Sequence, residues 1–165
     1  MNNATSDLTL FVYGTLKKGF PAHESFFGED DEIEEAVVRG ELFDLPAGYP
    51  ALAVPQKDIL AVGTANLPAD TERRRGESPA RRTPPAPEET VHGEIVRFGD
   101  SGRTLPMLDV FEGFDPGGES LYRRVLIAAW TASGETLSVW AYAMGSPPGK
   151  RLPDGKWPPS ENQSP

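Results

Sequence analysis

The sequence contains no cysteine and only two histidines, His23 and His92. Without cysteine the chain cannot form disulfides, use a thiol nucleophile or hold a metal through thiolates. The two histidines are far apart and lack a surrounding pattern of further ligands, so each is interpreted as a local hydrogen-bonding residue. The cysteine and histidine content therefore indicates no metal site.

Long apolar segments are also missing, and no run approaches the ~20 residues that a membrane-spanning helix requires. The first nine residues, MNNATSDLT, lack the charged segment followed by an apolar segment that marks a secretory signal. We therefore expect no membrane partner and a cytoplasmic location.

Basic side chains are in the minority, with 16 Lys and Arg against 25 Asp and Glu and a formal net charge of −9. Nucleic-acid-binding proteins usually carry a basic surface, so a nucleic-acid partner is not expected. The acidic run GEDDEIEE at 28–35 lacks the spaced oxygen ligands and the glycine of a calcium loop. A solvated acidic face is the favoured interpretation of this run, and a metal site is the alternative.

The chain of 165 residues is expected to form one domain that buries an ordinary core. Its 17 prolines and 17 glycines indicate many loops and few long helices. The loop TASGET predicts that the two strands flanking it form a hairpin. Segments that are apolar or alternate in polarity predict strands at 8–13, 36–45, 50–55, 90–98, 122–130 and 135–144.

Two segments differ from this pattern. Residues 68–90 contain five prolines, five arginines and five acidic residues, with almost no large apolar side chain. Such a composition buries too little surface to offset the entropy of ordering, so we expect a flexible insertion in a domain spanning 1–145. Contact of its arginines with an acidic partner is the alternative. Residues 146–165 are expected to form a loop-like tail, with Trp157 packed against the domain.

The first strand is followed by Gly-Thr-Leu-Lys-Lys-Gly at 14–19, which has the glycine spacing of a phosphate-binding Walker loop. That motif continues with Lys and Ser or Thr, whereas Phe20 and Pro21 follow Gly19, so nucleotide binding is disfavoured. The break at Gly14 predicts free backbone N–H groups, which bind carboxylates as readily as phosphates. The alternative is that both glycines only serve turns.

A short helix is predicted in the stretch DSGRTLPMLDVFEGF. Thr104 is a suitable N-cap, Pro106 is tolerated in a first turn, and Gly113 is a suitable stop, so the helix is expected over about 105–112. At roughly 100° per residue, Glu112 then lies on the apolar face of this helix.

A carboxylate on an apolar face has its pKa raised by desolvation and by the negative end of the helix dipole. A glutamate with a raised pKa is suited to general acid/base catalysis near neutral pH. The structural alternatives are that Glu112 forms an ion pair with Arg123 or Arg124, or that the short helix frays and leaves it in water.

These stretches together resemble the γ-glutamylcyclotransferase-like superfamily, most closely its γ-glutamylamine cyclotransferase and AIG2-like branch. The similarity spans about 9–145, and the chain departs from it in the insertion at 68–90 and in GFDPGGES at 113–120. The segments that carry it are FVYGTLKKGFPAH at 11–23, GELFDLPAGYPAL at 40–52, VHGEIVRF at 91–98, LPMLDVFEGF at 105–114 and LYRR at 121–124.

The resemblance implies an α+β fold, a compact mixed β-barrel flanked by short helices, with the active site at one end of the barrel. It implies that Glu112 is the catalytic acid/base and that no metal or organic cofactor is needed. The residues implied to bind the γ-glutamyl substrate are Tyr13, Gly14, Thr15 and Leu16, through their backbone, together with Tyr122 and Tyr49.

The implied reaction is attack of the α-amine of a γ-glutamyl amine or amide on its own γ-carbonyl, releasing 5-oxoproline. One alternative is a noncatalytic module that binds a small molecule or a protein. Another is an enzyme that removes a γ-glutamyl protecting group from a biosynthetic intermediate. The oligomeric state is not predicted.

Overall fold

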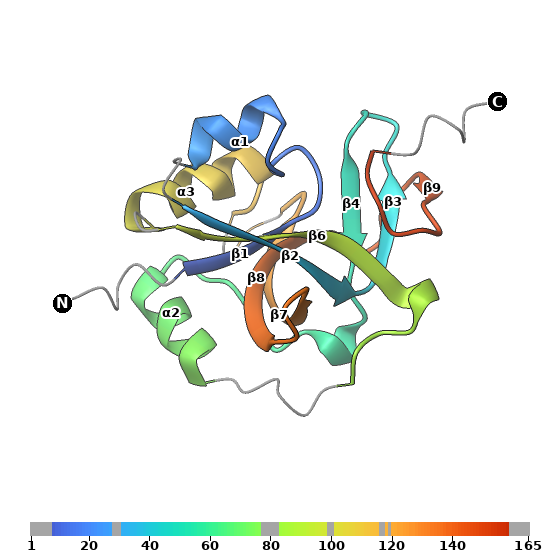
Figure 1. The fold of residues 1–165 in the computed structure, drawn as a ribbon. Helices are drawn as coiled ribbons and strands as arrows, with labels where there is room; N and C mark the ends of the chain where they lie inside the picture. The colour runs from blue at the N-terminus through green and yellow to red at the C-terminus, as the bar shows by residue number, and fades with distance from the viewer. Residues whose placement is uncertain are drawn as a thin grey trace.

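The computed structural model describes residues 8–27, 31–76, 83–98, 101–115, 118 and 120–158. Five strands form a closed barrel in the order β2-β6-β1-β8-β7, which closes where β2 also pairs with β7 (Figure 1). β1 is parallel to β8 and the other neighbours are antiparallel, so the predicted mixed β-barrel of the α+β class is confirmed. The barrel strands are β1 Leu8–Val12, β2 Glu32–Arg39, β6 Thr90–Phe98, β7 Arg123–Thr131 and β8 Thr136–Ala143.

Alternation along the strands separates the apolar side chains into two clusters. On β1, Phe11 belongs to one cluster, whereas Leu10 and Val12 belong to the other, because successive side chains of a strand point to opposite faces. Leu105 and Leu108 of helix α3 (Ser101–Glu112) join the cluster of Leu10 and Val12. β7 and β8 are buried along most of their length. They pair as antiparallel neighbours, which confirms the predicted hairpin.

The predicted strand over 36–45 is divided in the structure at Gly40. A Cβ on this glycine would lie 2.6 Å from the carbonyl oxygen of Ala53, so the backbones approach too closely for a side chain. The chain leaves the barrel here and enters a second sheet with the order β4-β3-β9. Its strands are β3 Glu41–Asp44, β4 Pro50–Ala53 and β9 Lys150–Arg151.

The C-terminal segment is thus partly strand and not only loop. β9 pairs with β3, and the Trp157 side chain is buried as predicted, with its ring centroid 5.7 Å from that of Phe20. Residues 159–165 lie outside the described part of the chain.

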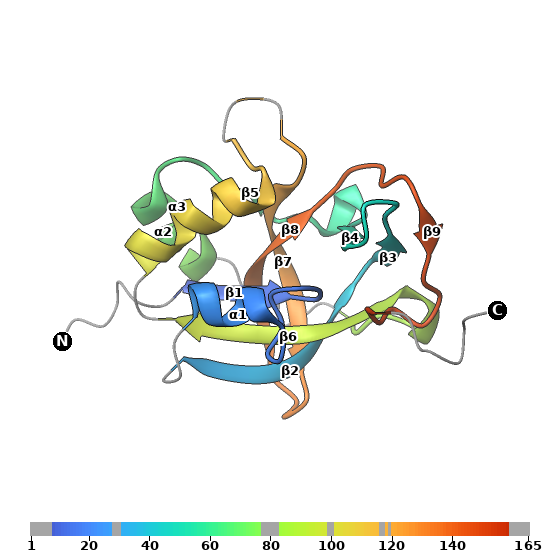
Figure 2. The same cartoon turned by 90° about the horizontal axis from the view of Figure 1, so that it is seen from above.

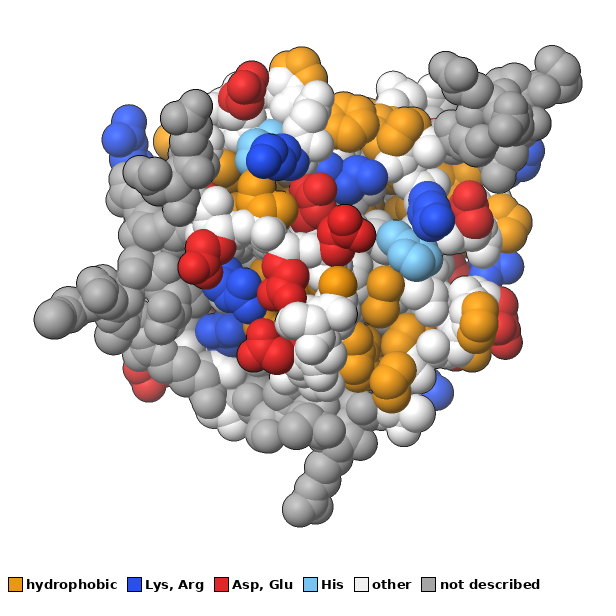
Figure 3. Space-filling view, in the orientation of Figure 1, with side chains coloured by type: hydrophobic (Ala, Val, Ile, Leu, Met, Phe, Trp, Pro, Cys, Tyr) orange, Lys and Arg blue, Asp and Glu red, His pale blue; other side chains and the backbone are white. Residues whose placement is uncertain are grey.

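Part of the acidic run forms the start of β2. Acidic side chains gather over the central face of the molecule, where β2 and β6 run (Figure 3). Glu34 accepts a hydrogen bond from Ser133 at 2.7 Å and lies 3.5 Å from Arg97. These contacts hold the pKa of Glu34 below its usual range, chiefly through the Ser133 hydroxyl.

The segment 68–90, expected to form a flexible insertion, contains secondary structure at both ends, because a 3-10 turn at Pro87–Glu89 leads into β6 at Thr90. Residues Leu67–Gly76 form helix α2, which packs on the barrel with little apolar surface. It is held by polar contacts that composition does not reveal: Asp70 is buried against Arg124 at 2.9 Å, and Arg74 donates to the carbonyl of Ser138 at 2.8 Å. Residues 77–82 lie outside the described part of the chain.

The remaining elements are short and surround the barrel (Figures 1 and 2). In the described part of the chain, no helix is long and apolar enough to span a membrane. These elements are helices α1 Pro21–Phe26 and α3 Ser101–Glu112, strand β5 Ala61–Val62 on the edge of β7, and 3-10 turns at Gln56–Asp58 and Pro87–Glu89.

Candidate active site

A pocket of about 530 Å³ lies where β1 and β8 end and β7 begins, which is one end of the barrel. The loop after β1, the start of α1, the start of β4 and the end of α3 complete its wall. All the site residues expected from the sequence line it, namely Tyr13, Gly14, Thr15, Leu16, Tyr49, Glu112 and Tyr122. The fold thus brings together side chains from segments that are up to 109 positions apart, counting from Tyr13 to Tyr122.

Glu112 is the last residue of α3, which the structure ends at the predicted stop, Gly113. Gly113 has a φ of 72°, and its N–H donates to the carbonyl of Val110 at 3.1 Å. The N–H of Phe114 donates to the backbone carbonyl of Asp109 at 2.8 Å. This pair of bonds is the Schellman arrangement, in which glycine accommodates the left-handed conformation. The helix end that carries Glu112 is therefore well defined, which argues against the fraying alternative.

The start of α3 differs from the prediction. The helix begins at Ser101, so Thr104 is buried inside it and is not its N-cap. Pro106 is accordingly in the helix interior and not in the first turn. The apolar face was nevertheless predicted correctly, because Leu105 and Leu108 are fully buried.

The carboxylate of Glu112 is half-buried at the pocket wall. Within the described residues, no group forms a hydrogen bond or ion pair with it. Burial raises its pKa from an ordinary 4.5 to about 7. Neither alternative pairing is formed among the described residues. Arg124 contacts Asp70 and Asp109 instead, and Arg123 is exposed and forms no ion pair with Glu112.

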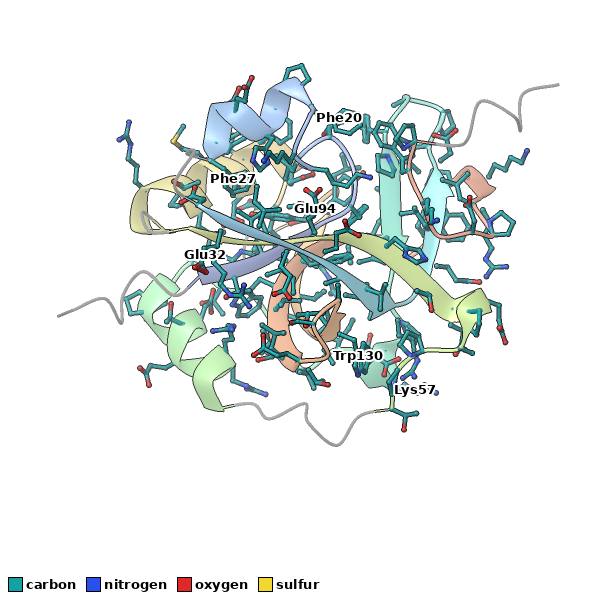
Figure 4. All side chains as sticks on the ribbon, in the orientation of Figure 1. Phe20, Phe27, Glu32, Lys57, Glu94 and Trp130 are labelled. Carbon is teal, nitrogen blue, oxygen red and sulfur yellow. The ribbon has the colours of Figure 1, made fainter. Side chains whose placement is uncertain are left out.

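Residues of the loop after β1 that line the pocket have backbone N–H groups without a partner among the described residues. In the part of the chain that the structure describes, the N–H groups of Gly14, Thr15 and Leu16 have no hydrogen-bond acceptor. The loop is anchored beyond them: Glu94 accepts from the N–H of Lys18 at 2.8 Å (Glu94 is labelled in Figure 4). The arrangement can accept a carboxylate oxygen, because closely spaced N–H groups carry partial positive charge.

His23 holds the same loop from the α1 side. Its buried ring donates through Nδ1 to the carbonyl of Leu16 at 2.8 Å, which confirms its predicted role as a local hydrogen-bonding residue. No group of three or more His, Asp or Glu side chains in the described residues is arranged to hold a metal ion.

Gly14 is required by a close approach and not by an unusual φ. A Cβ at this position would lie 2.5 Å from Cγ of Pro50. We expect Gly14→Ala to displace the loop and lower stability by ~1–3 kcal/mol, as overpacking does. It should also weaken the binding of a carboxylate at the pocket, because the N–H groups shift. Gly145→Ala is the matched control, since its Cβ would meet nothing within 4 Å. Thermal unfolding and ligand-binding measurements on both variants test this, and equal effects would contradict it.

Two buried tyrosines, Tyr13 and Tyr122, form part of the pocket wall. The hydroxyl of Tyr13 donates to the carbonyl of Tyr142 at 2.6 Å and accepts from the N–H of Leu52 at 3.2 Å. Tyr122 donates to the carbonyl of Pro50 at 2.7 Å. Burial, and then the negative charge of Glu112, raise the pKa of both phenols well above the usual value. Both therefore stay neutral at physiological pH and serve as fixed walls.

Tyr49 completes this wall with its ring centroid 6.5 Å from that of Tyr122, and its side chain remains partly exposed. The sequence reasoning missed Tyr142, which lines the pocket from β8. Its hydroxyl donates to Asp109 of α3 at 2.6 Å. The alternating pattern of the last predicted strand contains the only signal that could have identified it.

Behind the pocket lies a buried ionic cluster, Asp70–Arg124–Asp109, which the sequence analysis also missed. The guanidinium of Arg124 is fully buried and donates to both oxygens of Asp109, at 3.0 and 3.1 Å. It also lies 5.3 Å from the ring centroid of Trp140. The sequence contained a signal for this buried arginine. Arg124 and Leu126 are two positions apart in the predicted strand, so both side chains point to the same, inward face.

The fold and pocket define a class of protein: a small mixed β-barrel with a cavity at one end, in which a carboxylate has no partner among the residues that the structure describes. The family model described as "Gamma-glutamyl cyclotransferase, AIG2-like" matches residues 10–72 and 56–159. The chain therefore belongs to the AIG2-like γ-glutamyl cyclotransferase family, and the resemblance seen in its motifs is confirmed. Comparison with curated proteins gives no match.

Two solved structures share the fold at low sequence identity, and a third gives a weaker match. YkqA from Bacillus subtilis is 20% identical with a TM-score of 0.55 over 92% of this chain, which spans only 39% of YkqA. The uncharacterized protein PH0828 from Pyrococcus horikoshii is 18% identical with a TM-score of 0.50, covering 91% of this chain and 89% of that one. An AIG2-like protein from Mus musculus is 21% identical with a TM-score of 0.49, covering 84% and 77%.

Proposed function

We propose that this protein is a γ-glutamyl cyclotransferase that converts a γ-glutamyl amine or amide into 5-oxoproline and a free amine. The observation that carries the proposal is Glu112, a half-buried carboxylate without a partner among the described residues, with a pKa of about 7, in the same pocket as open backbone N–H groups. A carboxylate of this kind is suited to take up and return protons near neutral pH.

In this proposal the N–H groups of Gly14, Thr15 and Leu16 bind the α-carboxylate of the substrate. The fixed walls of Tyr13 and Tyr122 then hold the γ-glutamyl chain in a bent conformation that brings its α-nitrogen to its γ-carbonyl carbon. Because the nucleophile belongs to the substrate, positioning alone contributes up to ~7–11 kcal/mol to lowering the barrier. A chain without cysteine is therefore suited to this reaction.

The proposed step forms a bond between the α-nitrogen and the γ-carbonyl carbon and breaks the amide bond to the leaving nitrogen. The α-ammonium loses two protons on becoming a lactam N–H, and the leaving nitrogen gains two on becoming an ammonium. Glu112 accepts protons from the first nitrogen and donates them to the second, so it ends the cycle in its starting state. The balance requires no external reductant, oxidant or water.

The test is mass-spectrometric detection of 5-oxoproline from γ-glutamyl amines, γ-glutamyl dipeptides and glutathione between pH 5 and 9. Because the carboxylate form of Glu112 is the active base, we expect kcat/KM to rise about tenfold per pH unit below 7 and to level off above it. Binding without product across the panel would favour the noncatalytic module, and free glutamate in place of 5-oxoproline would indicate a hydrolase.

A further inference from the structure

We propose that Trp157, in the C-terminal segment, is a positioning residue of the pocket. It acts through Lys17 and Phe20 on the loop after β1, whose N–H groups bind the substrate carboxylate in the proposed function on which this inference rests. The segment that the sequence predicts to be a loop-like tail therefore contributes to substrate binding, although it does not line the pocket.

The loop between β1 and α1 is held to the barrel by few backbone contacts. β1 pairs with β6 up to Val12, and the loop begins after it. Among the described residues, the backbone–backbone hydrogen bonds of 14–20 all join residues three positions apart, as from the N–H of Lys17 to the carbonyl of Gly14 at 3.0 Å. Side chains and other elements must therefore fix this loop relative to the rest of the pocket.

Trp157 contacts the loop at two points. Its carbonyl accepts a hydrogen bond from the ammonium of Lys17 at 2.6 Å, and Lys17 directly follows the pocket residue Leu16. Its ring centroid lies 5.7 Å from that of Phe20, which lines the pocket and is labelled in Figure 4. The ammonium of Lys17 is also 6.0 Å from the ring centroid of Phe20. One residue thus holds both ends of the turn at 17–20.

Trp157 can hold the loop because it is itself fixed to the second sheet. Its side chain is buried, and its indole N–H donates to the carboxylate of Asp44, the last residue of β3, at 3.3 Å. The segment before it is also attached to β3, because β9 pairs with β3 and the N–H of Leu152 donates to the carbonyl of Leu42 at 2.7 Å. The C-terminal segment therefore connects the second sheet to the loop.

The helix that carries Glu112 packs in a different part of the core. Phe20 packs against the apolar cluster that contains Trp157, whereas Leu105 and Leu108 of α3 belong to the other cluster. A change at Trp157 should therefore displace the carboxylate-binding loop more than it displaces Glu112. This arrangement predicts an effect on substrate binding, measured as KM, with little effect on kcat.

The test measures KM, kcat and the calorimetric dissociation constant of 5-oxo-L-proline, the product, which carries the same carboxylate as the substrate. Trp157→Leu is expected to raise KM and this dissociation constant about tenfold, the value of a hydrogen bond to a charged group. It should change kcat by less than about threefold. Trp157→Phe, which keeps an aromatic ring against Phe20, should recover most of the lost affinity.

Trp130→Leu is the matched control for the loss of a tryptophan. Trp130 is partly buried on β7, does not line this pocket, and lies far from Phe20 in Figure 4. Its replacement should lower stability in urea unfolding without changing KM. Weaker binding in Trp130→Leu, equal to that in Trp157→Leu, would show a general loosening of the fold and would overturn the inference.

Lys17→Met tests the second contact by a change that leaves the buried tryptophan in place. The loss of the hydrogen bond to the carbonyl of Trp157 should raise KM and the dissociation constant about three- to tenfold. Lys156→Met is the matched control, because it removes the same charge at the exposed lysine that precedes Trp157. It should leave both constants unchanged.

The binding measurement separates this inference from the proposed function. Equal dissociation constants of 5-oxo-L-proline for the parent and for folded Trp157→Leu and Lys17→Met would overturn the inference alone. A parent that binds 5-oxo-L-proline more tightly than both variants do, but releases no 5-oxoproline from any γ-glutamyl compound, would contradict the proposed function and support the positioning role of Trp157.

Discussion

Glu112→Gln is expected to lower the rate of 5-oxoproline release by about 10²–10⁴-fold, the usual contribution of a general acid/base. The amide has the size of the carboxylate but cannot accept or return the protons that move between the two nitrogens. Substrate affinity should change little, because the backbone N–H groups after Tyr13 hold the α-carboxylate in our proposal. Steady-state kinetics and calorimetric binding of a slow substrate measure the two effects separately.

The same variant is expected to be at least as stable as the parent protein. The pKa of Glu112 is raised in the folded state, from 4.5 to about 7. A carboxyl group of this kind contributes stability that is fully present below pH 4.5 and is lost as pH rises through 7. Gln removes that loss, so we expect the variant to gain about 1–3 kcal/mol at pH 8 and almost nothing at pH 4. Urea unfolding at both pH values tests this.

Glu24→Gln is the matched control for these measurements. Glu24 is exposed on α1, beside the pocket residues Pro21 and Ala22, and does not itself line the pocket. Its replacement removes the same charge and should leave both activity and stability nearly unchanged. A folded Glu112→Gln variant that keeps most of the parent activity would remove Glu112 from the mechanism.

Arg124→Met is expected to cause the largest loss of stability, about 3–5 kcal/mol in the free energy of unfolding. The fully buried guanidinium lies between two carboxylates, 2.9 Å from Asp70 and 3.0 Å from Asp109. Methionine fills much of the volume but leaves both carboxylates buried without their cation. Denaturant unfolding at pH 7 measures the loss.

Arg123→Met is the control, because Arg123 is exposed one position earlier on β7 and should change stability by less than about 0.5 kcal/mol. Similar effects of the two substitutions would show that the cluster contributes little. Arg124→Met should also lower activity, since Asp109 binds Tyr142 of the pocket and lies on the helix that carries Glu112.

Several features of the fold follow from local patterns that act within one segment. Alternating polarity predicted the main strands, because a strand places successive side chains on opposite faces wherever it lies. The spacing of Leu105, Leu108 and Glu112 predicted an inward carboxylate, and Gly113 predicted the helix end. Each of these predictions depends only on residues close together in the sequence. The wrong start predicted for α3 therefore did not affect the prediction of its inward face or of its end.

The pocket depends on contacts that are distant in the sequence. The sequence could place Tyr13 after a strand and Glu112 on a helix face, but it could not bring them together without the resemblance to a family. The barrel brings these two residues together because β1 pairs with β8 and β8 pairs with β7. The end of β1 therefore lies at the same end of the barrel as the start of β7, which is the strand that follows α3.

The sequence analysis missed helix α2 and the buried position of Arg124 for the same physical reason. The composition of α2 contains too few apolar side chains to predict an ordered helix, and Arg124 has no local partner along β7. Each is stabilised only when Asp70, Arg124 and Asp109 meet in the interior, where ion pairing offsets the cost of burying charge. Residue spacing thus determined which faces of the strands and of α3 turn inward. The closed barrel decided which charges are paired and left the carboxylate of Glu112, among the described residues, without a partner at the pocket.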